Sequence, residues 1–363
     1  GGIQNTHQKF TVPAFTPVLF NLSLIIAAVF VAPYYDMPIY ILAWGVLLAG
    51  FLQLLIQISP LMSIDRLPIP KLDFKNKGVK RFITLILPAI LAGGIFQINL
   101  LIDTIFASIL ETGSPTWLYV SDRLIQFPLG IFAIAIGTVL LPTLSKYDLN
   151  YEKNKFIQSI KNGQRFVLFI GIPSLIGLFF CAEDIISTIF YRGAFTKIDV
   201  IKSSYSLMAF SLGLPFFMLM KVLTPAFFSR KDTKTPMIVA LISLILNVLF
   251  NYFLAFVIGL GHVGIALGSS IAALISVCIL EIILYKDGFI KLNSMFNKFN
   301  AMILVASSFL IIFLNFYSQS INFIDLDQLD RIFFLVIEVT VAIFIYFSIS
   351  RIIFGKPLKT ILE

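Results

Sequence analysis

The sequence has little charge and almost no histidine or cysteine. Only 13% of the 363 residues are Asp, Glu, Lys or Arg, whereas soluble domains carry about 25%. His7 and His262 are the only histidines, and Cys181 and Cys278 both lie inside apolar runs. Histidine-based acid–base chemistry, a disulfide framework and a metal site built on His or Cys are therefore not expected. Catalytic signatures such as a Walker loop, Gly-x-Ser-x-Gly or His-Glu-x-x-His are also absent, so the sequence indicates neither nucleotide hydrolysis nor a soluble enzyme.

Long apolar stretches fill most of the chain, and hydrophobic residues make up 58% of it. A membrane-spanning helix needs about 20 mostly apolar residues, and ten stretches qualify. The alternating pattern of a transmembrane barrel is absent. The sequence therefore predicts an all-α, polytopic transmembrane helix bundle. The expected spans are 13–33, 38–60, 82–110, 116–142, 165–190, 203–228, 236–258, 263–285, 299–317 and 332–354.

Lys and Arg are concentrated in every second connection between these spans. The connections 61–81 and 143–165 are rich in Lys and Arg, whereas 34–37 and 111–115 each carry one acidic and no basic residue. Because Lys and Arg accumulate in cytoplasmic loops, the basic side, including the C-terminus, is expected in the cytoplasm. The net charge of +8 reflects this bias and contact with anionic membrane lipid. It does not indicate nucleic-acid binding, which would need a basic patch on a soluble domain.

The first residues resemble the end of a helix more than the start of a chain, since the sequence begins with Gly1 and not with Met. The segment from Thr16 to Ser23 also echoes the segment from Thr235 to Ser243, and transporters are often built from repeated halves. Four expected spans precede the second segment from residue 82 onward, and none precedes the first. We therefore expect an N-terminally truncated repeat that lacks about four helices.

Charged and amide side chains inside the spans are the candidate functional residues, because a charge at the bilayer centre costs roughly 2.5–3.5 kcal/mol. Asn99 and Asp103 share one helix face, where they could hold a cation or a proton, or form an interhelical contact. Asp122, Arg123 and Gln126 lie at the start of the next span. Arg123 offers a fork of donors suited to phosphate, and the alternative is an interfacial pair that anchors the helix end.

Further polar residues occur in the later spans. Asn247 and Asn251 are four residues apart, a spacing typical of helix-to-helix contacts, and Lys221 and Glu281 lie close enough to cytoplasmic helix ends to snorkel. Glu338 has no local partner, and both a bundle contact and a lipid-facing groove remain open. Prolines inside apolar segments favour a bundle that bends during function. The hinge candidates are Pro88, Pro128 and Gly130.

Six short segments are distinctive: PAFTPVLFN at 13–21, QINLLIDTIF at 97–106, SDRL at 121–124, FPLG at 127–130, GTVLLP at 137–142 and YRGAFT at 191–196. In these segments the chain resembles one known family, the MurJ/MviN lipid II flippases, and several of the segments occur in that family's order. The likeness runs from residue 1 to about 285 and continues loosely to the end. The family belongs to the MOP exporter superfamily and has two lobes of six helices plus two C-terminal helices.

The resemblance implies a division of the chain, with the ten spans as family helices five to fourteen. Residues 1–60 would be the remainder of the N-terminal lobe and 61–81 a basic cytoplasmic loop. Residues 82–285 would form the C-terminal six-helix lobe, and 286–363 the C-terminal helix pair with a cytoplasmic tail. A chain without the first four helices is expected not to transport substrate alone.

The activity that the resemblance implies is alternating access. It would carry lipid II, an undecaprenyl-diphosphate-linked disaccharide-pentapeptide, from the inner to the outer leaflet of the bacterial cytoplasmic membrane. Arg123, with Asp122 and Gln126, would contribute to the cavity that receives the diphosphate and sugars. The last two helices would line a groove for the polyprenyl tail. Gln126 replaces a Glu that many relatives carry, which removes a titratable group from the cavity.

An ion-coupling site is a further implication of the resemblance. Some family members bind sodium through an aspartate that matches Asp103 and an Asn-x-x-x-Asp pair on a later helix. Here that pair is Asn247 and Asn251, so one carboxylate is missing and sodium coupling is weakened. A proton gradient or the membrane potential are the other sources of energy. The ion-coupling candidates are Asp103, Asn247, Asn251 and Asn99.

Three other functions compete with this one. Another MOP-type flippase for polysaccharide-linked lipids would share the fold, and a non-transporting scaffold of the cell-wall machinery would share the membrane location. A polyprenyl-dependent glycosyltransferase is disfavoured, because no long soluble loop carries paired carboxylates. The expected partners are lipid II, membrane lipids and cell-wall synthesis proteins, with no nucleic acid.

Overall fold

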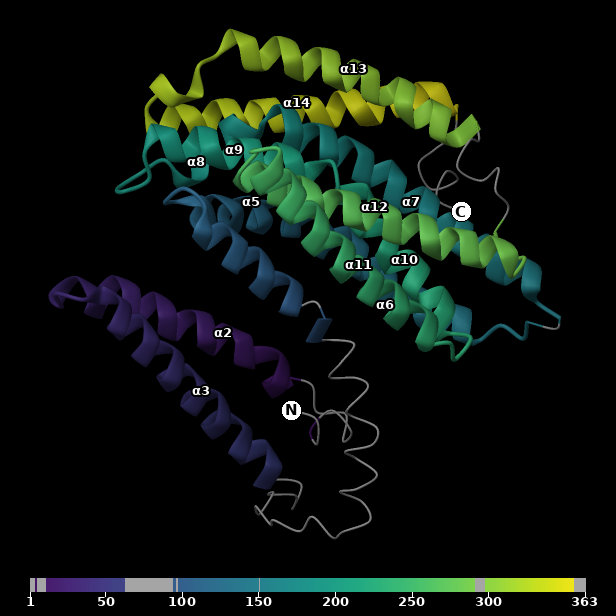
Figure 1. Cartoon of the computed structure of the whole chain (residues 1–363), viewed down its shortest axis with the longest axis horizontal. Helices are drawn as coiled ribbons and strands as arrows, with labels where there is room; N and C mark the ends of the chain where they lie inside the picture. The colour runs from purple at the N-terminus through teal and green to yellow at the C-terminus, as the bar shows by residue number, and fades with distance from the viewer. Residues whose placement is uncertain are drawn as a thin grey trace. The chain divides into compact units, whose positions relative to one another are not determined.

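The computed structural model describes residues 4, 11–62, 94–95, 97–149, 151–290 and 298–355, and every regular element among them is helical. This confirms the all-α prediction for the described part of the chain (Figure 1). Eight of the described helices are long and apolar enough to cross a membrane, and one bent pair makes nine. The chain divides into two units, Gly1–Thr84 and Leu85–Glu363.

The smaller unit contains a pair of helices, α2 (Thr11–Ile26) and α3 (Pro38–Met62), joined by short π and 3-10 turns (Ala27–Val31 and Ala32–Tyr34). Small residues bring the two helices close together, since a Cβ on Gly45 would lie 2.9 Å from the Ala27 Cβ. The Gln53 Nε2 donates a hydrogen bond to the Thr16 carbonyl oxygen at 2.8 Å. These contacts make the two expected spans 13–33 and 38–60 a helical hairpin.

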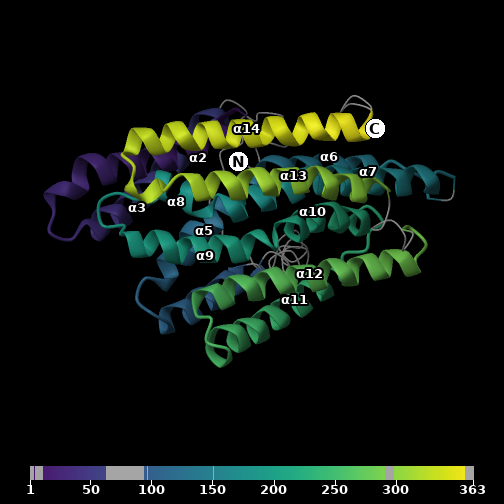
Figure 2. The same cartoon turned by 90° about the horizontal axis from the view of Figure 1, so that it is seen from above.

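The larger unit is a bundle of helices (Figures 1 and 2). Its first described helix is Gln97–Ile109. The expected span 82–110 is described only there and at 94–95, and Pro88 lies outside the described residues. The next elements are α5 (Ser114–Pro128), a π segment (Leu129–Ala133), α6 (Ile134–Ser145), α7 (Lys153–Phe180), α8 (Ala182–Phe190), α9 (Lys197–Ser211) and α10 (Leu214–Phe228). The chain continues with α11 (Lys234–Tyr252), a π segment (Phe253–Val257), α12 (His262–Lys286), α13 (Lys298–Ser320), a 3-10 turn (Phe323–Asp325) and α14 (Gln328–Phe354).

Helix α10 lies at the centre of the bundle and is apolar almost all round, as a buried helix must be. Met218, Val222 and Phe227 on it are fully buried. Glycines on the neighbouring helices allow the close approach: a Cβ on Gly163 of α7 would lie 3.0 Å from Val222, and one on Gly171 would lie 3.1 Å from the Met218 sulfur. The core of the larger unit is thus built where α7 and α10 cross.

The expected span 165–190 is wrong at both ends. Helix α7 begins at Lys153, because its polar first turns bury Phe156 and Ile160 in the core and are therefore amphipathic rather than exposed loop. The helix ends at Phe180, since Cys181 leaves the helical region with φ −92° and ψ 17°. A separate short helix, α8, follows.

The expected span 203–228 is a broken helix. Helices α9 and α10 meet at a 40° bend, and Pro215 lies in the first turn of α10, where a missing N–H is tolerated. Helix α9 starts earlier than expected because Thr196 and Asp199 form a capping box at its N-terminus. Pro128 ends α5 and Gly130 lies in the π segment that follows, so the helix is irregular at these two hinge candidates.

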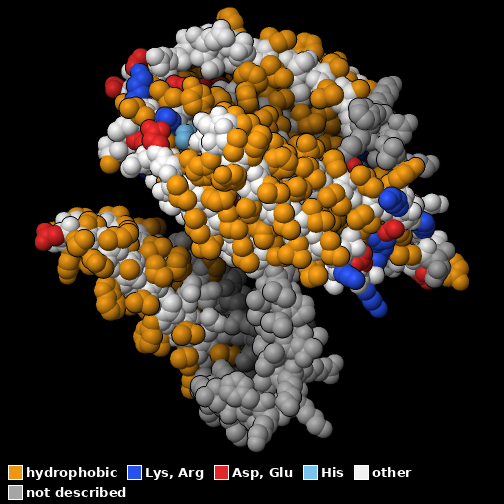
Figure 3. All heavy atoms as spheres, in the orientation of Figure 1, with side chains coloured by type: hydrophobic (Ala, Val, Ile, Leu, Met, Phe, Trp, Pro, Cys, Tyr) orange, Lys and Arg blue, Asp and Glu red, His pale blue; other side chains and the backbone are white. Residues whose placement is uncertain are grey.

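Apolar side chains cover the middle of the visible face of the larger unit, and charged side chains gather at its two ends (Figure 3). Large exposed hydrophobic residues occur along α11, α13 and α14, including Leu249, Ile312 and Phe344. A soluble protein exposes few contiguous apolar patches of this extent. The distribution is that of a protein surrounded by lipid tails, and the chain is a membrane protein.

Candidate functional site

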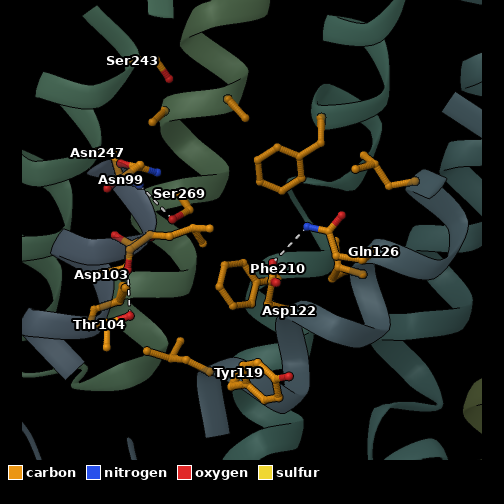
Figure 4. Close-up of a pocket in the computed structure, with 18 of the residues that line it drawn as sticks. Asn99, Asp103, Thr104, Tyr119, Asp122, Gln126, Phe210, Ser243, Asn247 and Ser269 are labelled. Atoms are coloured by element: carbon orange, nitrogen blue, oxygen red, sulfur yellow. Dashed lines mark hydrogen bonds between the residues drawn. The ribbon is translucent and has the colours of Figure 1, made fainter. Parts of the chain in front are cut away.

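A cavity of about 500 Å³ lies inside the larger unit, between the helix Gln97–Ile109 and helices α5, α10, α11 and α12. Most of its lining is apolar, with polar groups on opposite sides (Figure 4). The polar residues that line it are Asn99, Asp103, Thr104, Tyr119, Asp122, Gln126, Lys221, Ser243, Asn247 and Ser269. Such a mixture of apolar wall and a few convergent polar groups is typical of a ligand site.

A chain of hydrogen bonds around the buried Asn251 lies behind one side of the cavity and connects the lining residues Asp103, Asn247 and Ser269. The Asn251 Nδ2 donates to the Asp103 Oδ1 at 2.6 Å and to the Asn247 Oδ1 at 2.8 Å. The Asn247 Nδ2 in turn donates to the Ser269 hydroxyl at 2.8 Å. The structure therefore brings together three of the four ion-coupling candidates, from helices far apart in the sequence. Gly268 is needed here, because a Cβ at that position would collide with the Asn251 side-chain oxygen.

Asn99, the fourth ion-coupling candidate, lines the same side of the cavity near Asn247 (Figure 4). Its Oδ1 and the Asn251 Oδ1 are buried and have no hydrogen-bond partner among the described residues. These two oxygens are the open acceptors of the group. A buried acceptor without a donor is costly, so the oxygen of Asn99, which lines the cavity, is a place where a donor from water or substrate would be favourable.

Two of the oxygens that could bind a cation already accept hydrogen bonds from an amide. The Asn251 Nδ2 donates to both the Asp103 Oδ1 and the Asn247 Oδ1. A cation needs oxygen ligands and is repelled by an N–H donor. As arranged, the Asn251 amide therefore opposes a sodium ion at the Asp103 and Asn247 oxygens.

The opposite side of the cavity comes from α5. Asp122 and Gln126 line it one helical turn apart, and the Gln126 Nε2 donates to the Asp122 Oδ1 at 3.4 Å. Arg123 is exposed and is not among the lining residues. Its guanidinium lies 4.7 Å from the ring centroid of Tyr119, which does line the cavity. Adjacent residues on a helix point about 100° apart, which is why Asp122 and Arg123 face different surroundings.

Lys221 is the residue that sequence reasoning did not select. It lines the cavity from α10 and is the only Lys or Arg among the described lining residues. Because Lys221 lies near the end of the expected span 203–228, its side chain was expected to snorkel toward the membrane surface. The available signal was its spacing from Phe217, because residues four apart share one helix face and Phe217 also lines the cavity.

The remaining polar residues of the spans lie elsewhere. Glu281 on α12 accepts a hydrogen bond from the Gln164 Nε2 on α7 at 2.8 Å, so it is an interhelical contact. Glu338 on α14 is completely buried and away from the cavity. Of the two alternatives for Glu338, the structure therefore supports a contact inside the bundle and not one with lipid.

Comparison with known proteins identifies the family. A sequence profile described as lipid II flippase MurJ matches residues 1–357. The chain belongs to the MurJ family. Relatives named as probable lipid II flippases MurJ are found in Vibrio cholerae, 43% identical over 77% of this chain and 53% of the relative, and in Haemophilus influenzae, 37% identical over 95% and 69%. The chain thus spans between about half and two thirds of the length of these MurJ relatives.

Solved structures agree with this family and with its fold. A lipid II flippase MurJ in an inward closed conformation superimposes with a TM-score of 0.78 and 29% identity, over 97% of this chain and 69% of that one. A multidrug-resistance MATE transporter of the MOP superfamily, in an outward-facing conformation, shares the fold with a TM-score of 0.50 at 12% identity, over 74% of this chain and 61% of that one. The expected MOP-type architecture is confirmed for the part of the fold present in this MurJ-family chain.

Proposed function

We propose that the protein is a lipid II flippase that moves undecaprenyl-diphosphate-linked peptidoglycan precursor across the bacterial cytoplasmic membrane by alternating access. The observation that carries this proposal is the family match over residues 1–357, which includes every described helix that lines the cavity. A flippase is a transporter and not an enzyme.

Two cations are suited to the diphosphate in this proposal. Lys221 lines the cavity, and Arg123 lies over Tyr119 beside it. Lysine binds phosphate as a point charge, and arginine can bind two oxygens of one phosphate at once. Asp122 and Gln126 are suited to sugar hydroxyls, because a carboxylate and an amide together accept and donate hydrogen bonds. The irregular backbone after Pro128 is the proposed hinge in the described residues.

Transport in this protein is further proposed not to depend on a sodium ion at Asp103 and Asn247. The support is the Asn251 amide, whose N–H groups already hold both oxygens. A proton gradient or the membrane potential is then the proposed source of energy. The polyprenyl tail is proposed to lie against the exposed apolar faces of α13 and α14, which include Ile312 and Phe344.

Cellular placement follows from the same proposal. The protein would lie in the inner membrane with its C-terminus in the cytoplasm, because the basic connections are expected on that side. Its partners would be lipid II, membrane lipids and proteins of cell-wall synthesis.

The experiment is rescue of cells depleted of their own lipid II flippase, with membrane insertion of every variant checked by blotting. The 363-residue chain is compared with any longer form that its gene encodes, and the form that rescues is then used for mutants. Lys221→Ala and Arg123→Ala are expected to abolish or strongly reduce rescue. Arg351→Ala, an exposed basic residue in the last turn of α14, is the matched control and is expected to rescue fully.

The alternatives give different results. Full rescue by both Lys221→Ala and Arg123→Ala would contradict a role for these cations in binding diphosphate. Insertion without rescue by either form would favour a scaffold or a flippase for a different polyprenyl-linked substrate. Rescue by the 363-residue chain, without any longer form present, would contradict the expectation that both complete lobes are required.

A further inference from the structure

Glu338 lies well inside α14 and away from the cavity. Its side chain is completely buried, and neither carboxyl oxygen has a hydrogen-bond partner among the described residues. An ionised carboxylate without donors in an apolar surrounding is far more costly than the neutral acid. The surroundings are apolar, since Ile176, Leu310 and Leu314 form a hydrophobic cluster around this part of α7 and α13.

A second buried carboxyl lies on α8, the helix that packs against α14. Asp184, in the first turn of α8, is 4% exposed, and its Oδ2 also has no partner among the described residues. The two helices are in contact, since the Gln328 Nε2 of α14 donates to the Thr188 carbonyl oxygen of α8 at 2.9 Å. Cys181, where α7 meets α8, is buried in the same cluster as Leu310 and Leu314, and the Tyr317 hydroxyl near the end of α13 donates to the Phe334 carbonyl oxygen of α14 at 3.0 Å.

The charged groups around this pair do not neutralise it. Glu183 adds a further negative charge next to Asp184. Arg331, on α14, donates from Nε to the Phe323 carbonyl oxygen and from Nη2 to that of Ile324. Its Nη1 points to carbonyl oxygens near the end of α8. Its donors are therefore directed at backbone carbonyls and not at the acids.

We propose that Asp184 and Glu338 form a proton-binding carboxyl pair that joins helix α14 to helix α8. The ligand is a proton, because a buried carboxyl without a hydrogen-bond donor is far less costly as the neutral acid than as the ion. Two carboxylates buried at one helix contact cannot both ionise at low cost, so the pair retains one proton.

Loss of the last proton has a structural consequence. It would leave two negative charges in the apolar seam between α8 and α14, where the donors of Arg331 are directed at backbone carbonyls and not at the acids. Repulsion would then weaken the attachment of the C-terminal helix pair to the rest of the bundle. The inference concerns a site outside the cavity and does not depend on which substrate the protein transports.

The test measures thermal unfolding of the purified 363-residue chain in detergent micelles between about pH 6 and about pH 9. A native state that holds a proton which the unfolded chain releases loses stability as the pH rises. The unfolding midpoint of the unmodified chain is expected to fall by about 3 °C or more over this interval. Glu338→Gln, which imitates the protonated acid, and Asp184→Asn are each expected to remove most of this dependence. Glu183→Gln changes the neighbouring half-buried acid and is expected to keep it.

A second measurement identifies the proton directly. Infrared difference spectra between the two pH values are expected to show loss of a protonated carboxyl C=O band, and Glu338→Gln or Asp184→Asn should remove that band. Glu183→Gln is the control and is expected to leave the band unchanged, which shows that the band does not come from Glu183. If the midpoint shift and the carboxyl band persist unchanged in both Glu338→Gln and Asp184→Asn, the pair does not bind the proton and the inference is wrong. Absence of any pH-dependent carboxyl band in the unmodified chain would also overturn it.

Discussion

At the scale of single residues, Asn251 occupies oxygens of two residues, Asp103 and Asn247, that line one side of the cavity. It supplies N–H donors to Asp103 and Asn247, where a second carboxylate would supply oxygens. The amide of Asn251 donates hydrogen bonds to the two acceptor oxygens and so occupies them. A carboxylate at the same position would have no donor, would add a negative charge and would leave both oxygens free to bind a cation.

The first prediction exchanges that amide for an acid. Asn251→Asp is expected to make thermal stability depend on sodium, with about 1.4 kcal/mol of added stability when sodium is at ten times its Kd. The unmodified chain is expected to unfold at the same midpoint in sodium and in potassium buffers. Asn315→Asp makes the same chemical change on the exposed face of α13 and should show no selective response. A sodium-specific shift in the unmodified chain would contradict the proposal that no sodium binds there.

Gly268 is the second residue whose size matters. The Asn251 side chain occupies the space beside its Cα, so Gly268→Ala must displace either Asn251 or α12. We expect a loss of about 1–3 kcal/mol of stability, as found for overpacked cores, together with reduced rescue. Gly177→Ala on α7, where nothing lies within 4 Å of the added carbon, is the control and should unfold at or slightly above the original midpoint. Equal behaviour of the two variants would show that α11 and α12 are not closely packed at Asn251.

At the scale of helices, α5 is held against α9 by two hydrogen bonds to neighbouring turns. The Trp117 Nε1 donates to the Asp199 Oδ1 at 2.7 Å, and the Ser121 hydroxyl donates to the Ser203 carbonyl oxygen at 2.7 Å. Asp199 also caps α9. These contacts fix the rotation of α5, which in turn directs Asp122 toward the cavity.

The third prediction breaks one of these contacts. Trp117→Phe keeps an aromatic ring but removes the indole donor, and we expect a loss of about 1.5–3 kcal/mol, the usual effect of one hydrogen bond to a charged group. The measurement is the midpoint of thermal unfolding in micelles. Trp44→Phe is a matched control, because Trp44 is 68% exposed on α3 and should change stability by less than about 0.5 kcal/mol. A larger effect at Trp44 than at Trp117 would contradict the described α5–α9 contact.

At the scale of the whole molecule, charge at the helix ends sets the orientation in the membrane. Lys231 lies in the connection between α10 and α11, and Asp325 in the connection between α13 and α14, where its side chain is 68% exposed. Hydrophobic side chains cover the surface between the charged ends of the larger unit (Figure 3). The basic side is expected to face the cytoplasm.

The fourth prediction tests this orientation by labelling single cysteines. In a background with Cys181→Ala and Cys278→Ala, a membrane-impermeant maleimide applied to intact cells is expected to label Asp325→Cys and not Lys231→Cys. After the inner face is opened, both should react. Labelling of Lys231→Cys from outside would reverse the orientation that we assign to every helix.

Local pattern allowed much of the architecture to be predicted. The apolar runs identified most of the helices, and the four-residue spacing of Asn247 and Asn251 placed them on one face. The errors occurred where tertiary contacts override composition. The polar first turns of α7 became helix because they bury Phe156, and the helix ends at Cys181, which separates α8 from α7 within one expected span.

The sequence by itself determined the class of the protein: its membrane-spanning helices, their expected order across the bilayer and the family motifs. These depend on local composition, because a helix of about 20 apolar residues crosses a membrane whatever its neighbours are. Only the tertiary structure decided which polar groups meet. Asn251 bonds to Asp103 across 148 residues of chain, Lys221 lines the cavity while Arg123 does not, and Glu338 is buried in the helix that contacts α8. The reason is physical: residue spacing fixes the face of one helix, but the partner of that face depends on how the helices pack.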